Sequence, residues 1–153
     1  MAINRGKQFE DVIRECMKRI PETTIIRMPD PTNGYLGIRN ISDFIAYHYP
    51  HQYFLECKSV HGNTLPLSNI TLHQWDGLID VAQINGVVAG VICWWVDKDT
   101  TRFIPIEVLR EIGKTEKRSI RFDHADNRII DIPGEKKRVF FDYDLSVLFK
   151  EDM

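Results

Sequence analysis

The chain has 153 residues, of which 43% are hydrophobic and 27% are charged, and its formal net charge is −2. This composition excludes a disordered chain, and no apolar run reaches the roughly 20 residues of a membrane span, so we expect one domain over residues 1–153 and no membrane partner. The near-neutral charge also excludes nucleic-acid binding through bulk charge, which leaves only a local basic surface for that role.

Three cysteines indicate the redox environment. Cys16, Cys57 and Cys93 are far apart, odd in number and each set in an apolar pattern. We therefore expect buried thiols rather than disulfides or a zinc framework. The first ten residues contain no apolar signal-peptide core, so the expected location is the cytoplasm.

The first half of the chain predicts a helix followed by three strands. The helix lies between Asn4 and Pro21, and Glu10 lies at the edge of its apolar stripe. That stripe consists of Phe9, Val12, Ile13, Cys16, Met17 and Ile20. Residues 23–28 predict a short strand, and residues 29–40, rich in proline, glycine and asparagine, predict a loop. Two apolar-rich runs around the Tyr-Pro-His-Gln turn then predict a β-hairpin over residues 43–60.

The second half predicts a helix, two strands and a shorter helix. Ser68 or Thr71 caps the first of these helices, which ends at Asn85-Gly86 and has an apolar face formed by Trp75, Leu78, Ile79 and Ala82. Residues 87–96 are apolar on both faces, which predicts a central strand with residues 100–106 as its antiparallel neighbour. Residues 107–112 predict a helix ended by Gly113, residues 114–122 an exposed basic segment, and residues 144–149 a last helical turn. The expected fold is α/β, a mixed central β-sheet flanked by helices.

Three charged residues within the predicted hairpin point to chemistry. Glu56 and Lys58 are two residues apart and project from one face of their strand, while Leu55 and Cys57 project from the other. Hairpin pairing brings Asp43 close to them. Two carboxylates at one point attract a hard cation such as Mg²⁺, and the lysine can neutralise charge in a transition state, so the set predicts metal-dependent phosphodiester cleavage. The alternative is a turn aspartate beside a solvated ion pair on an edge strand.

Four segments together resemble the PD-(D/E)xK nuclease superfamily, and more narrowly the RecU-type Holliday junction resolvases. They are "NRGKQFE" (residues 4–10), "SDF" (42–44), "LECKSV" (55–60) and "LPLSNITLHQ" (65–74), of which the last is the most specific. The resemblance runs in order over residues 4–110 and continues weakly to "RSI" (118–120).

This resemblance implies a restriction-endonuclease-like core and a role for five residues. Asp43 and Glu56 match the metal-binding acids, and Gln74 matches a glutamine beside the metal or its water. Lys58 matches the catalytic lysine, and Glu10 matches an assisting acid on the first helix. The family further implies dependence on Mg²⁺, with Mn²⁺ as a substitute, and a homodimer that cuts opposed strands of a four-way DNA junction.

The sequence departs from the family pattern in two places. Where the family tends to have threonine near the first aspartate, this chain has Ile41 and Ser42, which argues against a metal contact from that position. The family also carries a longer insertion, the stalk, before the catalytic aspartate, whereas here only residues 29–40 are available. Nuclease chemistry is therefore predicted more firmly than junction specificity.

Contacts to DNA phosphates are expected from local cations, namely Arg5, Lys7, Arg27 and Arg39. Arg27 and Arg39 are favoured because they bracket the short loop, and a further basic run occupies residues 114–121. His61 is either solvated or a phosphate contact.

Smaller alternatives concern the turn and the tryptophans. Asp97 and Asp99 are interpreted as turn residues, and one of Trp94 and Trp95 as a core residue with the other facing a dimer partner. Two other functions remain open: a repair or restriction-like duplex endonuclease on the same fold, and a non-catalytic DNA-binding dimer scaffold. The preferred cleavage sequence is not predicted.

Overall fold

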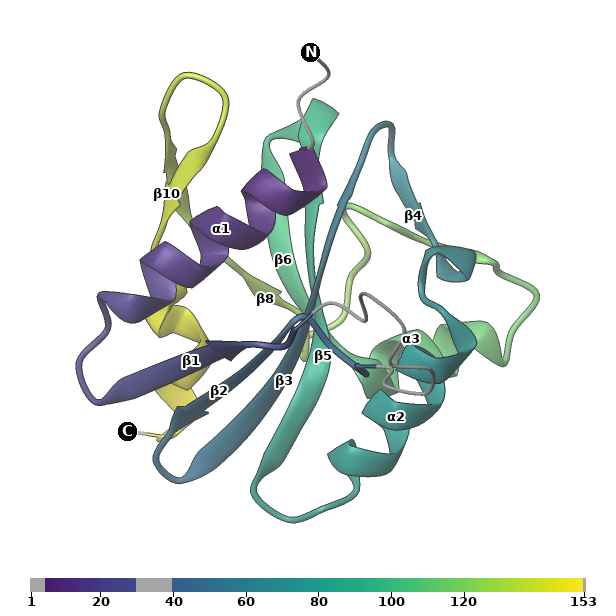
Figure 1. Ribbon diagram of the computed structural model, residues 1–153. Helices are drawn as coiled ribbons and strands as arrows, with labels where there is room; N and C mark the ends of the chain where they lie inside the picture. Colours follow the sequence, from purple (N-terminus) through teal and green to yellow (C-terminus); the bar gives the residue numbers. More distant parts are fainter. Residues whose placement is uncertain (1–4, 30–39, 153) are drawn as a thin grey trace.

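A six-stranded mixed β-sheet forms the centre of the computed structural model, which describes residues 5–29 and 40–152 (Figure 1). Its strand order is β1-β2-β3-β5-β6-β8, in which β3 and β5 are parallel and the other neighbours antiparallel. The strands are β1 (Thr23–Arg27), β2 (Phe44–His48), β3 (His51–Val60), β5 (Val87–Trp95), β6 (Thr100–Pro105) and β8 (Ile130–Asp131). The predicted mixed α/β fold is confirmed.

Helices and two small antiparallel strand pairs surround this sheet. The helices are α1 (Arg5–Lys18), α2 (Leu72–Ala82) and α3 (Ile106–Gly113), with 3₁₀ turns η1 (Leu67–Asn69), η2 (Val96–Lys98) and η3 (Leu145–Asp152). The pairs are β4 (Thr64–Pro66) with β7 (Ser119–Arg121), and β9 (Gly134–Lys136) with β10 (Phe141–Tyr143). None of the helices in this part of the chain is long and apolar enough to cross a membrane.

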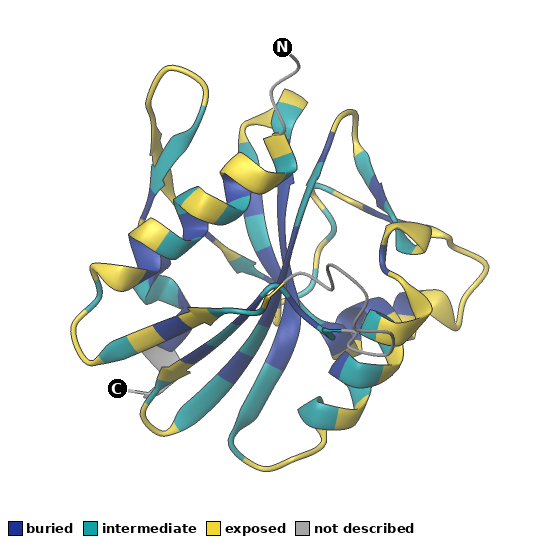
Figure 2. Ribbon diagram, in the orientation of Figure 1, coloured by how far each residue is buried: buried dark blue, intermediate teal, exposed yellow. Residues whose placement is uncertain are grey.

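The two faces of the sheet support separate apolar cores. One core packs α1, β10 and η3 on the sheet, and the other packs α2 and α3 on the opposite face. Strand β5 contributes to both and is buried along most of its length (Figure 2). Trp94 belongs to the first core and Trp95 to the second. The expectation that one tryptophan faces a dimer partner is therefore wrong, because β5 is central and both of its faces are covered within the chain.

The hairpin that carries the candidate chemistry is formed as predicted. Strands β2 and β3 pair antiparallel, with Phe44 opposite Leu55 and His48 opposite His51. Because neighbouring residues alternate between faces, Leu55 enters the core under α1 while Glu56 does not.

Several predicted boundaries differ from the structure. Thr71, not Ser68, caps α2, and the helix ends at Ala82 because Gly86, with φ +86°, is used in the turn before β5. Gly113 lies inside α3, whose cap is Lys114. The segment predicted to be exposed after α3 contributes Ile120, which is buried, to β7. The three cysteines are free and buried, as predicted.

Candidate active site

The register of β2 and β3 sets Asp43 beside Glu56. Asp43 directly precedes β2, and the first pair of the ladder is Phe44 with Leu55, so Asp43 lies level with the next residue of β3. The backbone N–H of Cys57 donates a hydrogen bond of 2.9 Å to Asp43 Oδ2. This bond fixes one oxygen of Asp43 to β3 and leaves the other to face its surroundings.

Glu56 is a buried carboxylate with only one of its oxygens hydrogen-bonded. Its side chain is 4% exposed, and Oε2 accepts from Lys58 Nζ at 3.0 Å and from Gln74 Nε2 at 2.9 Å. Oε1 is buried and has no hydrogen-bond partner among the residues that the structure describes. Burial, and next the charge of Asp43, raise the pKa of Glu56 to about 7. The site is therefore short of positive charge.

Gln74 reaches Glu56 from the first turn of α2, where it also belongs to a capping box. Its backbone N–H donates to Thr71 Oγ1 at 3.2 Å, and its side-chain Oε1 accepts from the Thr71 N–H at 3.1 Å. A backbone N–H can only donate and an ionised carboxylate can only accept, so these neighbours determine which end of the amide faces which group. Gln74 consequently presents N–H, and not its oxygen, to Glu56.

Glu10 approaches the same point from α1. Burial, followed by a hydrogen bond and charge repulsion from Asp43, raises the pKa of Glu10 to about 8. Arg27 of β1 opposes this effect: its guanidinium lies 3.7 Å from Glu10 Oε2 and 3.4 Å from Asp11 Oδ1. The arginine is thus held against α1 by two carboxylates.

The structure brings together the five residues that the sequence selected for catalysis, namely Glu10, Asp43, Glu56, Lys58 and Gln74. Of the cations selected for DNA contact, Arg27 joins this cluster through Glu10, and Arg5 and Lys7 lie in the first turn of α1. Arg39 and residues 30–38 of the short loop lie outside the described residues. Within the described ranges, no group of three or more His, Cys, Asp or Glu side chains is arranged to hold a metal ion.

Sequence reasoning missed the link between the cap of α2 and the acids. Thr71 was recognised as a capping candidate, and Gln74 three residues later completes the Thr-x-x-Gln pattern of a capping box. That pattern contains no information about Glu56, because the contact depends on where α2 packs. Helix α2 packs closely against the segment before β2. A Cβ on Gly77 would lie 2.1 Å from Ile41 Cγ2, so only glycine fits there without a shift of Ile41.

The residues around Asp43 and the β3–β4 turn have local structural roles. Ser42 is buried and its hydroxyl donates to the Phe44 carbonyl at 3.0 Å. Asp97 accepts from the Gly62 N–H at 2.6 Å and lies 3.1 Å from His61 Nδ1, which agrees with a turn-stabilising role. His61 remains exposed.

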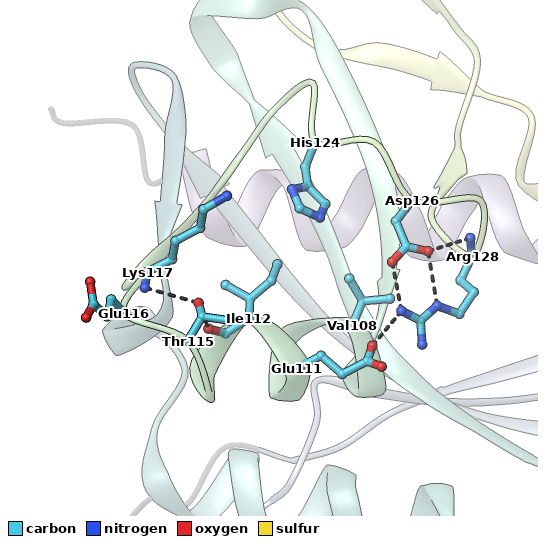
Figure 3. Close-up of a pocket in the computed structure, with 9 residues that line it drawn as sticks. All are labelled: Val108, Glu111, Ile112, Thr115, Glu116, Lys117, His124, Asp126 and Arg128. Atoms are coloured by element: carbon cyan, nitrogen blue, oxygen red, sulfur yellow. Dashed lines mark hydrogen bonds and ion pairs between the residues drawn. The ribbon is translucent and has the colours of Figure 1, made fainter.

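A pocket of about 630 Å³ lies elsewhere, beside α3 (Figure 3). Its floor includes Val108 and Ile112, and its rim carries an ionic cluster of Glu111, Asp126 and Arg128. None of the five candidate catalytic residues lines it.

Comparison with known proteins gives one family and one fold. The model of the family described as RecU, recombination protein U, matches residues 4–146. A solved structure of Archaeoglobus fulgidus Hjc, described as a Holliday junction resolvase from an archaeal hyperthermophile, is 21% identical, covers 76% of this chain and 88% of its own, and has a TM-score of 0.53. At that identity the likeness supports the fold alone. No match was found among curated proteins.

Proposed function

The chain belongs to the recombination protein U family, and on that premise we propose that it is a divalent-metal-dependent endonuclease that resolves four-way DNA junctions by paired cuts. The observation that carries the proposal is the convergence of Asp43, Glu56 and Lys58 at one end of the paired strands β2 and β3. Burying an incompletely paired carboxylate costs folding free energy. Folding does not require these three charges, whereas metal-dependent catalysis does.

The donor set fits a hard divalent cation. Glu56 Oε1 is a buried oxygen without a hydrogen-bond partner in the described part of the chain, and the Asp43 carboxylate is its neighbour. Mg²⁺ typically binds one or two carboxylates and keeps several waters, so two acids suffice. We propose that Asp43 and Glu56 hold Mg²⁺, or Mn²⁺ in its place. When bound, this ion supplies Lewis acidity toward phosphate and lowers the pKa of water.

Lys58 is proposed to act directly on the scissile phosphate. Its ammonium lies 3.0 Å from Glu56 Oε2 and its side chain is 19% exposed, so it can also face a ligand. A cation held in a partly buried site stabilises negative charge that develops on the phosphoryl oxygens.

Gln74 and Glu10 are proposed to position the two acids. The amide oxygen of Gln74 already accepts from Thr71, so the contacts favour orientation of Glu56 over direct ligation of the metal. Burial, together with a hydrogen bond to Asp43, raises the pKa of Glu10 to about 8, and through that bond Glu10 can hold the Asp43 carboxyl group in place. Both roles keep the metal-binding oxygens in place before the ion arrives.

Binding of branched DNA by a homodimer completes the proposal. Two cuts on opposed strands require two active sites, and a C2 dimer is the commonest way to supply them. Arg5 and Lys7 are proposed as phosphate contacts at the start of α1, with Arg27 and Arg39 on either side of the short loop.

The proposal is tested with end-labelled four-way junctions and matched linear duplexes, incubated with and without Mg²⁺. We expect symmetric cuts in the junction only with metal, no cuts by Asp43→Asn, and a dimeric mass by light scattering. Equal cleavage of both DNAs would indicate a repair or restriction-like duplex nuclease. Binding of DNA without cleavage under any metal condition would indicate a non-catalytic scaffold.

A further inference from the structure

The β9–β10 hairpin is an exposed arm that the candidate active site does not use. Strands β9 and β10 pair antiparallel, and the loop between them is closed by a 2.8 Å hydrogen bond from the Lys137 N–H to the Phe140 carbonyl. Every residue from 133 to 139 is exposed. In Figure 1 the arm rises beside α1, on the side of that helix away from β4.

The base of this arm is firmly anchored. The Phe140 ring lies 5.5 Å from Trp94, and Phe141 stacks on Tyr143 at 5.6 Å. A Cβ at Gly134 would lie 2.7 Å from the Tyr143 ring, so the strands approach as closely as glycine permits. These contacts fix the direction in which the arm points.

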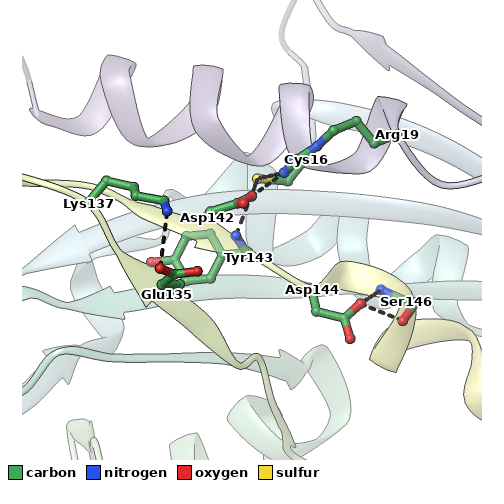
Figure 4. Close-up of polar contacts among 8 residues, drawn as sticks. All are labelled: Cys16, Arg19, Glu135, Lys137, Asp142, Tyr143, Asp144 and Ser146. Atoms are coloured by element: carbon green, nitrogen blue, oxygen red, sulfur yellow. Dashed lines mark hydrogen bonds and ion pairs between the residues drawn. The ribbon is translucent and has the colours of Figure 1, made fainter.

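Polar contacts attach the same base to α1 (Figure 4). The Tyr143 N–H donates to Cys16 Sγ at 3.4 Å, and Asp142 forms an ion pair with Arg19. Figure 4 shows these groups directed at one another between α1 and β10. The arm is therefore rigid relative to α1, which also carries Glu10.

The tip of the arm carries three consecutive cations, Lys136, Lys137 and Arg138. Lys136 lies 3.1 Å from Asp99 and Lys137 lies 3.2 Å from Glu135, whereas the described residues form no ion pair with Arg138. Exposed pairs of this kind contribute about 0–1 kcal/mol and exchange readily for other anions. The tip thus presents positive charge on a chain whose net charge is −2.

The arm and the candidate active site lie on opposite flanks of α1. Glu10 of α1 faces the acids, whereas Cys16 of the same helix and Arg19 just after it contact Asp142 at the base of the arm. In Figure 1 the tip of the arm points toward the same end of the molecule as the first turn of α1, which carries Arg5 and Lys7. A duplex bound along this end of the molecule can therefore meet both sets of cations.

We propose that Lys136, Lys137 and Arg138 bind backbone phosphates of the duplex arm whose scissile strand occupies the Asp43–Glu56 site. The inference rests on the proposed function in that DNA is the substrate. Contacts of this kind position the duplex without reading its sequence. They add to the cations at the start of α1 and extend the bound length of DNA beyond the site.

The test is the salt dependence of junction binding, measured by fluorescence anisotropy in the Asp43→Asn background so that no DNA is cut. The variant replaces residues 136–138 with alanine, and the control removes three exposed cations elsewhere. That control is Lys18→Ala, Arg110→Ala, Arg128→Ala. Each neutralised phosphate contributes about 0.9 to the slope of log K against log salt, so we expect the variant to lose about 2 to 3 from the slope and at least 10-fold in affinity. Lys136→Arg with Lys137→Arg should retain both.

The outcomes separate this inference from the proposed function. An unchanged slope in the variant, or an equal loss in the control, would overturn the inference while leaving the nuclease intact. Unchanged binding with a new tendency to aggregate would likewise overturn it, and would assign the lysines to protection of a sheet edge. Failure of the Asp43→Asn chain itself to bind junctions would overturn both proposals.

Discussion

Replacing Glu56 by glutamine should stabilise the metal-free protein at alkaline pH. The native state holds the pKa of Glu56 at about 7, against an ordinary 4.5, so it binds its proton more tightly than the unfolded chain does. The contribution of Glu56 to the free energy of unfolding is therefore greatest below pH 4.5, falls as the pH rises toward 7, and is level above that value. At about 1.4 kcal/mol per pKa unit, the penalty at pH 8 is about 3 kcal/mol.

Glutamine removes this penalty. Its amide oxygen still accepts from Gln74, and its nitrogen can donate toward Asp43, where two carboxylates now oppose each other. The attraction to Lys58 is already included in the pKa of Glu56, so the expected net gain is about 3 kcal/mol. For a chain of this size that gain raises the melting temperature by about 6–12 °C.

The assay is thermal and urea unfolding of both proteins at pH 5 and pH 8, first with a chelator and then with Mg²⁺. We expect the variant to be the more stable at pH 8 without metal, the difference to shrink at pH 5, and Mg²⁺ to stabilise only the unmodified chain. Glu116→Gln, an exposed change of the same chemistry, should show no such pattern. A Glu56→Gln protein less stable than the unmodified chain at pH 8 without metal would refute the reasoning.

Three further results are expected. Asp43→Asn should reduce cleavage by more than the 10–100-fold typical of residues behind the metal ligands while junction affinity stays within about 3-fold, as measured by single-turnover cleavage and anisotropy; normal cleavage would remove Asp43 from the site. Lys58→Ala should lower kcat and leave affinity nearly unchanged, because its charge acts on the transition state, and weak binding with normal turnover would make it a simple phosphate contact. Thr71→Ala should cost about 1 kcal/mol of stability and weaken Mg²⁺ binding by 10–100-fold in calorimetry, because it releases Gln74, whereas Thr71→Ser should retain both. Equal Mg²⁺ binding by both Thr71 variants would show that the cap and the site are independent.

Sequence periodicity was sufficient for the elements that pack on the main sheet. The stripe of α1, the two-faced apolar run of β5 and the hairpin of β2 and β3 each repeat for long enough to define a period. Strands β7 and β9 have only three residues each, which is too short for any pattern to show. Their positions depend on tertiary contacts such as those of Phe140 with Trp94.

The candidate site likewise contains some residues that local rules predict and others that depend on tertiary packing. Two-residue alternation placed Glu56 and Lys58 on one face, and hairpin pairing added Asp43, because both rules are local. The contact of Gln74 with Glu56 joins α2 to β3 and follows from helix packing, which no local rule describes. For Gln74 and Glu10, resemblance to a family supplied what spacing alone could not.

Arg27 shows how a cation near a candidate active site can already have partners within the protein. Beside the short loop it is proposed to contact DNA, and in the structure its guanidinium also lies near the carboxyl groups of Glu10 and Asp11. Its charge lowers the pKa of Glu10, whereas burial and Asp43 raise that pKa. Part of the charge of Arg27 therefore already interacts with an acid of the protein itself. The net charge of the chain is −2, and cations such as Arg27 interact with its own acids. Attraction for phosphate must therefore come from cations farther from the candidate site. A basic arm anchored across α1 from those acids supplies that charge without neutralising the carboxylates on which a metal would depend.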